Sequence, residues 1–118
     1  MSIKSFGAKV FASIIHKKTQ KWVNDPINTQ KKVFEQLLED AKHTAFGKDH
    51  NFAYINSYED FVKHVPIRDY EGLRPYVDRV VAGESDVLWK GKPLYFAKTS
   101  GTTSGAKYIP LTKESMPY

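Results

Sequence analysis

The sequence is strand-like in only two places, and both lie near its C-terminal end. The segment PLYFAK (93–98) combines aromatic and apolar residues, and KYIPLT (107–112) is β-prone, although Pro110 confines it to a sheet edge or a strand end. Two strands are too few for a stable sheet unless further strands or helices support them. We therefore expect an α/β fold, in which a mostly helical N-terminal portion leads into a β-hairpin of about 94–98 and 107–111. Such a hairpin begins the sheet of a larger protein.

The first helix is expected over about 3–23 and has a basic, amphipathic pattern. Apolar residues recur at helical spacing while lysines lie mostly off that stripe, and Pro26 forbids continuation. The apolar positions are Ile3, Phe6, Val10, Phe11, Ile14 and Ile15. A helix of this kind can lie on an anionic membrane or across the outside of a larger body. We favour the second interpretation.

Two further helices are bounded by glycine and proline. One is capped by Asn28 or Thr29 and is followed by Gly47. The other has Pro75 at its first helical position and Gly83 after its end. Both predictions use the preference of glycine for helix exits, and the second also uses the preference of proline for helix starts.

Capping side chains indicate two more helix starts. Ser57 and Asp60 have the spacing of a capping box, and Pro66 closes that short segment. Thr112 is expected to cap a new helix in KESMPY. We divide the chain into an amphipathic arm (1–27), a helical region (28–83), and a strand–loop–strand segment with the start of a helix (84–118).

Composition excludes several classes of protein. The chain carries a net charge of +5, but its basic residues are spread over both halves, so a nucleic-acid partner is not expected. There is no cysteine, which excludes disulfide frameworks, thiol catalysis and cysteine zinc sites and fits a cytoplasmic location. No apolar run approaches the roughly 20 residues that a membrane span needs.

The loop TSGTTSGAK (99–107), which joins the two strand-like segments, has the chemistry of a phosphate site. Gly101 and Gly105 permit positive φ and let N–H groups form a concavity that favours anions. The loop adds the hydroxyls of Thr99, Ser100, Thr102, Thr103 and Ser104, and the positive charge of Lys107. Many donors, little bulk and one cation suit a di- or triphosphate.

Two other interpretations of this loop fit its sequence less well. A Walker loop needs four residues between its first glycine and a Gly-Lys pair, whereas three residues separate Gly101 from Gly105 and Ala106 precedes Lys107. An ordinary hairpin loop is usually shorter and less rich in small hydroxyl residues.

The remaining polar residues indicate structure more than chemistry. The four histidines lack metal-ligand spacing, and a surface or hydrogen-bonded role is expected for them. Asp69, Glu71 and Asp78 lie among Arg68, Arg74 and Arg79, which indicates a salt-bridged helix surface. Glu114 is the carboxylate nearest the loop, and we interpret it as a first-turn helix charge.

The loop resembles the phosphate-binding loop of the acyl-adenylate-forming superfamily, whose pattern is T-S-G-[ST]-T-G-x-P-K. The matching positions are Thr99, Ser100, Gly101, Thr102, Thr103 and Lys107. Ser104 and Ala106 depart from the pattern in the way typical of one branch, the auxin-responsive acyl-acid amido synthetases and their bacterial relatives. The blocks TAFGKDHNF, VPIRDYEGLRPYVDRVVAGE and VLWKGKPLYFAK also resemble that branch. The resemblance covers roughly residues 30–118.

This resemblance implies the N-terminal part of an ATP-dependent amide ligase. Such an enzyme joins a carboxylic acid to ATP, releases pyrophosphate, and passes the acyl group from acyl-AMP to an amine, here an amino acid. The implied ATP-binding residues are Thr99, Ser100, Gly101, Thr102, Thr103, Ser104, Gly105 and Lys107, with Lys107 also acting in catalysis. Mg²⁺ is expected with ATP, its ligands outside this chain. The 118 residues alone are expected to be inactive.

The alternative is a non-enzymatic helical module that docks on a membrane surface or a protein partner through its basic first helix. The loop discriminates between the two functions, because a docking module has no need of a phosphate site.

Overall fold

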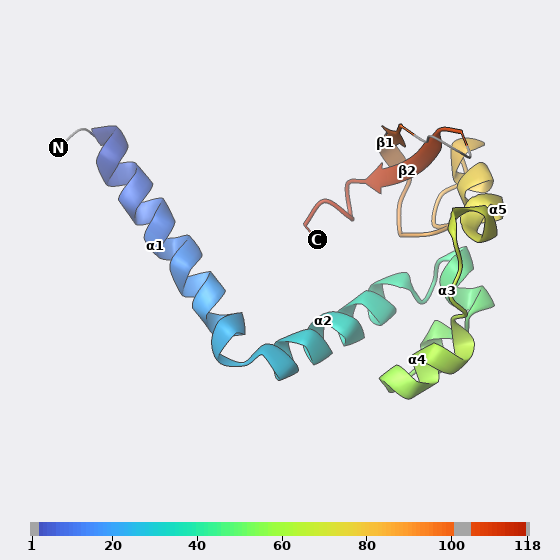
Figure 1. Cartoon of the computed structure of the whole chain (residues 1–118), viewed down its shortest axis with the longest axis horizontal. Helices are drawn as coiled ribbons and strands as arrows, with labels where there is room; N and C mark the ends of the chain where they lie inside the picture. Colours follow the sequence, from blue (N-terminus) through green and yellow to red (C-terminus); the bar gives the residue numbers. More distant parts are fainter. Residues whose placement is uncertain (1–2, 101–104, 118) are drawn as a thin grey trace. The chain divides into compact units, whose positions relative to one another are not determined.

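The computed structural model describes residues 3–100 and 105–117. In chain order the elements are α1 (Ile3–Asn24), α2 (Pro26–Ala41), α3 (Ala45–Asp49), the 3-10 helix η1 (Phe52–Tyr54), α4 (Tyr58–His64), α5 (Tyr70–Val81), β1 (Pro93–Thr99) and β2 (Lys107–Thr112) (Figure 1). The expected fold class, a mostly helical portion followed by a β-hairpin, is confirmed.

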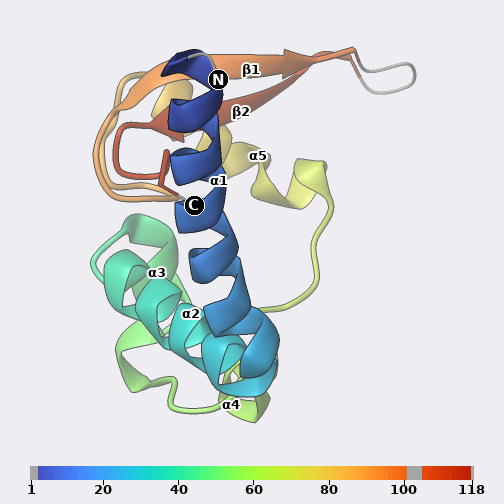
Figure 2. The same cartoon turned by 90° about the vertical axis from the view of Figure 1, so that its left-hand side faces the viewer.

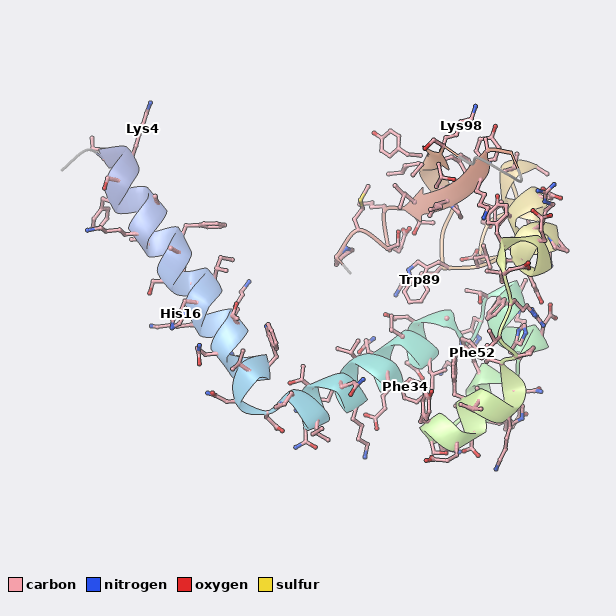
Figure 3. All side chains as sticks on the ribbon, in the orientation of Figure 1. Lys4, His16, Phe34, Phe52, Trp89 and Lys98 are labelled. Atoms are coloured by element: carbon pink, nitrogen blue, oxygen red, sulfur yellow. The ribbon has the colours of Figure 1, made fainter. Side chains whose placement is uncertain are left out.

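The chain divides into two compact units, residues 1–34 and 35–118. The first unit contains α1, whose predicted extent is confirmed and whose residues are all at least partly exposed. The apolar stripe of α1 is exposed too, from Ile3 at 92% to Ile15 at 44%. Figure 3 shows the side chains of Lys4 and His16 on this helix.

Helix α2 begins at Pro26, before the residues expected to cap it. Asp25 holds the capping position instead, because its carbonyl accepts a hydrogen bond from the Thr29 N–H at 3.1 Å. The Asn28 side chain donates back to the Asp25 carboxylate at 3.0 Å. Proline suits the first helical position, since its φ is preset and its missing N–H would have no partner there. The prediction of an Asn28 or Thr29 cap was therefore wrong by one turn.

Gly47 does not follow the end of α2, as predicted, but lies inside the separate helix α3. The Thr44 hydroxyl caps α3 by accepting from the Gly47 N–H at 3.0 Å, and it donates to the Ala41 carbonyl at 2.7 Å. A Cβ on Gly47 would collide with the Ala41 carbonyl oxygen and lie 2.9 Å from its carbon. Glycine is present here because two helix ends approach closely, not because the backbone is left-handed.

Helix α4 confirms the predicted cap with a small change in its partners. The Ser57 hydroxyl accepts from the Asp60 N–H at 3.1 Å, and the Asp60 carboxylate accepts from the Asn56 N–H at 3.3 Å. The hydrogen bond from Asn56, followed by one from the Ser57 side chain, lowers the pKa of Asp60 below its ordinary value. Both bonds favour the ionised form.

Ser57→Ala is expected to raise the pKa of Asp60 part of the way toward its ordinary value, since the Asn56 bond remains. The pKa is lowered in the folded state, so this cap stabilises the fold above the unfolded-state pKa of Asp60. The contribution is lost as pH falls through the lowered folded value. Carboxyl-carbon NMR titration of the two proteins measures the shift. An Asp60 pKa that is identical in both proteins would contradict the assigned cap.

Helix α5 begins at Tyr70, five residues before the predicted start at Pro75. Asp69 caps it by accepting from the Gly72 N–H at 2.9 Å. Pro75 lies inside the helix, where it lacks the N–H that would bond one turn back. Gly83 follows the helix end with φ +98°, which confirms its predicted role as an exit residue.

The core of the second unit lies among the helices and the segment 82–92. Its buried apolar residues are Leu38, Ala41, Ile55, Val77, Val80 and Val87. The N–H groups of Ala45 and Phe46 at the start of α3 donate to the carbonyls of Asp86 and Val87 at 2.8 and 2.9 Å. The segment 82–92 is thereby fixed to α3.

An aromatic cluster joins four helical elements. Phe46 stacks on His50 at 4.0 Å and meets Phe52 and Tyr76 edge-on, with ring centroids 5.9 and 5.2 Å away. Phe52, labelled in Figure 3, also lies 6.1 Å from Phe61 of α4. The cluster connects α3, η1, α4 and α5.

The hairpin pairs β1 and β2 antiparallel, with Thr99 opposite Lys107 and Pro93 opposite Thr112. Figure 2 shows the strands side by side, with α5 beside them. The helix predicted after Thr112 is wrong within the described residues, because 113–117 form turns. Thr112 nevertheless accepts from the Ser115 N–H at 3.0 Å, as a cap does. Pro117 cannot supply the next N–H of a helix.

Candidate functional site

The candidate phosphate loop joins the two strands of the hairpin, and the residues at its two ends pair with each other. Thr99 ends β1, Lys107 begins β2, and the two lie opposite each other in the ladder. Ser100, Gly105 and Ala106 continue from this pair, and Ser100 and Gly105 are exposed. The predicted site residues Gly101, Thr102, Thr103 and Ser104 lie outside the described residues. The structure therefore brings together both ends of the predicted site at the tip of a hairpin.

Gly105 has the backbone conformation that the sequence predicts for the loop. Its φ is +78°, which side-chain-bearing residues rarely adopt, and no atom of residues 3–100 or 105–117 lies within 4 Å of a Cβ placed there. The conformation favours glycine, and the described neighbours leave the space around it open. An open, positive-φ backbone is what a ligand needs to approach the main chain closely.

Lys107 is half-buried, and its ammonium lies over an aromatic ring. The Nζ atom is 5.5 Å from the centroid of the Tyr70 ring, a cation–π arrangement. Thr99 and Lys107 face the same side of the hairpin because opposite residues in an antiparallel pair share a face. Lys98 pairs with Tyr108 and faces the other side (Figure 3). Only one of the two flanking lysines is thus held over Tyr70.

Tyr70 is the residue of this site that the sequence did not reveal. Its hydroxyl accepts from the Tyr108 N–H at 2.8 Å and donates to the Tyr108 carbonyl at 3.4 Å. The guanidinium of Arg74 lies 6.0 Å from the same ring. Tyr70 and Tyr108 are 38 positions apart, so no local spacing could have indicated the contact. The available signal was the capping Asp69, which places the start of α5 at Tyr70.

No described side chains form a ligand set for Mg²⁺. In residues 3–100 and 105–117 no group of three His, Cys, Asp or Glu side chains could hold a metal ion. The Glu114 carboxylate packs against Gly91, where a Cβ would collide with it. Glu114 is therefore occupied by packing, not directed at a metal.

Two of the four histidines make local hydrogen bonds. Nδ1 of the buried His50 lies 2.7 Å from the Phe46 carbonyl, and Nδ1 of His64 lies 2.9 Å from the Asp60 carbonyl. Both confirm the expected hydrogen-bonded role.

The salt-bridged surface predicted for α5 is confirmed in part, since one ion pair joins two residues of the predicted set and another has a different acidic partner. Arg74 bonds Glu71 at 2.8 Å. Arg79 is bidentate to Glu84, with distances of 2.8 and 2.6 Å, and Glu84 was not part of the predicted set. This pairing raises the pKa of Arg79 and lowers the pKa of Glu84, because each charge favours the other. Arg74 and Arg79 are thus each paired with a carboxylate at the surface of the described structure.

The comparison with known protein families identifies the family of the chain. The GH3 family N-terminal domain matches residues 15–118, which include the hairpin, α5 and the loop. The chain belongs to the GH3 family. This confirms the resemblance to the auxin-responsive acyl-acid amido synthetases. Residues 3–14 of α1 precede the match.

Three relatives show the range of the GH3 family. The chain is 35% identical over 92 residues to "Indole-3-acetic acid-amido synthetase GH3.15" of Arabidopsis thaliana, covering 74% of this chain and 15% of that protein. It is 33% identical over 97 residues to "4-substituted benzoates-glutamate ligase GH3.12" of the same plant, covering 79% and 17%. It is 27% identical over 89 residues to "Jasmonoyl--L-amino acid synthetase JAR4" of Nicotiana attenuata, covering 74% and 15%. The matched region thus spans 15–17% of these relatives.

None of the described helices is both long and apolar enough to cross a membrane.

Proposed function

We propose that this GH3 chain is the N-terminal part of an ATP-dependent acyl-acid amide ligase. The observation that carries the proposal is the family match over residues 15–118, because it includes the hairpin and its loop. The relatives are named as an acid-amido synthetase, a benzoates-glutamate ligase and a jasmonoyl-amino acid synthetase. We propose the same reaction class here, with a carboxylic acid and an amino acid as substrates, in the cytoplasm.

In the proposed reaction the loop binds the β- and γ-phosphates of ATP. A carboxylate oxygen of the acid bonds to the α-phosphorus, and the bond to the β-phosphate oxygen breaks to release pyrophosphate. The amino acid nitrogen then attacks the acyl carbon, and AMP leaves with the bridging oxygen. Mg²⁺ is proposed to arrive with ATP, and no described residue is assigned to it.

Each part of the loop has a proposed role. Positive φ at Gly105 aims backbone N–H groups at phosphate oxygens, and the hydroxyls of Thr99 and Ser100 add donors. The same role is proposed for Gly101, Thr102, Thr103 and Ser104. Lys107 neutralises the charge that develops on pyrophosphate as it departs.

The docking-module alternative has one observation in its favour, the exposure of the apolar residues of α1. The first 24 residues also contain five lysines and no acidic residue. The match of the GH3 domain to the loop-bearing part of the chain favours the ligase, since docking requires no phosphate site.

An oxygen-tracing experiment tests the proposed reaction in the complete enzyme. A carboxylic acid labelled with ¹⁸O at both oxygens is supplied with ATP and an amino acid, and AMP and the amide are analysed by mass spectrometry. We expect one ¹⁸O in AMP for each amide formed, because the acid's oxygen remains on the α-phosphorus. Omission of the amino acid is the control and leaves acid-dependent ATP–pyrophosphate exchange intact. Label in inorganic phosphate would instead show an acyl-phosphate route and overturn the adenylate proposal.

A further inference from the structure

Tyr70 contacts the strand next to the predicted phosphate-binding lysine through both of its hydroxyl bonds. The hydroxyl accepts from the Tyr108 N–H at 2.8 Å and donates to the Tyr108 carbonyl at 3.4 Å. Both groups of Tyr108 therefore point away from β1, toward the outer edge of β2. A tyrosine hydroxyl can donate one hydrogen bond and accept another. It therefore satisfies both backbone groups of Tyr108, as a neighbouring strand would do.

The ring of Tyr70 contacts the lysine itself. Lys107 Nζ lies 5.5 Å from the ring centroid. A lysine side chain is long and loses considerable rotamer entropy when it is held. One side chain thus fixes the backbone beside Lys107 and restricts the position of its ammonium.

Tyr70 is itself held by a packed helix. Asp69 caps α5 through Gly72 at 2.9 Å, and α5 buries Val77 and Val80 in the core at 4% and 5% exposure. Tyr70 is the first residue of this helix. The position of Lys107 is therefore set by α5 and the core beneath it.

We propose that Tyr70 is a positioning residue that holds Lys107 in place for the departing pyrophosphate. The inference rests on the proposed function of the loop. A cation–π contact at a partly exposed site favours the held position only about two- to fivefold. Contact with a phosphate oxygen is stronger, so Lys107 can leave the ring for the phosphate without a large barrier.

Two substitutions separate the two contacts in the complete ligase. Tyr70→Phe keeps the ring and removes the hydroxyl bonds, and it is expected to lower kcat of acid-dependent ATP–pyrophosphate exchange about 2- to 10-fold. Tyr70→Leu removes both contacts and is expected to lower it further. Transfer of the acyl group from preformed acyl-AMP to the amino acid is expected to keep its wild-type rate in both variants.

A double-mutant comparison shows whether Tyr70 acts through Lys107. Tyr70→Leu is expected to have no further effect on exchange in a Lys107→Ala background. The matched control is Tyr76→Phe, which removes from the same helix a tyrosine hydroxyl bond to Asp49 of 2.8 Å. This control is expected to leave exchange unchanged.

The outcomes distinguish this inference from the proposed function. Wild-type enzyme with no acid-dependent exchange would refute the ligase proposal itself. An active wild type with unchanged exchange in Tyr70→Leu would overturn the positioning role alone. Equal losses in both half-reactions, or equal losses in the presence and absence of Lys107, would show a merely structural residue and also overturn it.

Discussion

Lys107→Ala is expected to slow acid-dependent ATP–pyrophosphate exchange by the complete ligase about 10- to 150-fold. Pyrophosphate becomes more negative as acyl-AMP forms, and loss of one charge-assisted contact costs about 1.5–3 kcal/mol. Lys107 is the flanking lysine held over Tyr70. Acyl transfer from preformed acyl-AMP is expected to stay near its wild-type rate, since pyrophosphate has already left. Exchange and single-turnover transfer assays measure the two steps separately.

Lys98→Ala is the matched control for this prediction. Lys98 also flanks the loop but pairs with Tyr108, on the face opposite to Lys107. Its removal is expected to change exchange by no more than about twofold, as for an ordinary surface charge. Thr103→Ala is expected to slow exchange less than Lys107→Ala, because it removes a neutral donor. Wild-type exchange in Lys107→Ala would require the phosphate-loop assignment to be abandoned.

Gly47→Ala is expected to destabilise the domain by at least about 3 kcal/mol, at the upper end for overpacking. The added Cβ would collide with the Ala41 carbonyl oxygen and lie 3.1 Å from the Lys42 Cα, both backbone atoms. The carbonyl cannot move away freely, because the buried Thr44 hydroxyl donates to it at 2.7 Å. Calorimetric unfolding of the complete protein measures the loss, and soluble yield is expected to fall with it.

Gly7→Ala provides the comparison for a helical glycine with free space around it. Among the residues that the structure describes, and apart from the backbone of α1 itself, none lies within 4 Å of a Cβ placed at Gly7. Alanine is favoured over glycine inside a helix by about 0.5–1 kcal/mol, so this variant is expected to be as stable as wild type or slightly more stable. Equal stability of the Gly7 and Gly47 variants would show that α3 does not approach Ala41 as described.

Local patterns predicted the elements whose causes are local. The apolar spacing of α1 and the proline after it gave the correct extent, and the capping Ser57 gave the start of α4. The hairpin followed from two β-prone segments with glycines between them. In each case the residues that determine the structure lie within one or two turns of it.

The elements that the sequence did not predict depend on a distant contact in one case and on a competing local cap in another. Helix α3 begins where the Ala45 N–H bonds the carbonyl of Asp86, 41 positions later in the chain. The start of α5 was assigned to Pro75 because prolines favour first positions, whereas Asp69 holds the stronger cap. At α3 a tertiary contact outweighed the preference of glycine for helix exits. At α5 a local cap outweighed the preference of proline for helix starts.

The candidate site also combines a feature that the sequence predicts with one that it does not. The conformation of Gly105 could be predicted, because positive φ is a property of single residues. The contact between Lys107 and Tyr70 could not, because it depends on the packing of α5 against β2. Chemistry within a loop is readable from sequence, whereas the support beneath it comes from the fold.

Because Thr99 pairs with Lys107, the face of the hairpin on which the lysine lies is determined by its position in β2 and not by the sequence of the loop. Successive residues of a strand face opposite sides. The hydroxyl of Tyr70, at the start of α5, holds the backbone of Tyr108 in place. The loop of residues 100–106 can therefore change in length or sequence, in evolution or by grafting, without moving the Lys107 ammonium to the other face of the hairpin. A single residue inserted between Lys107 and Tyr108 would turn it to the opposite face.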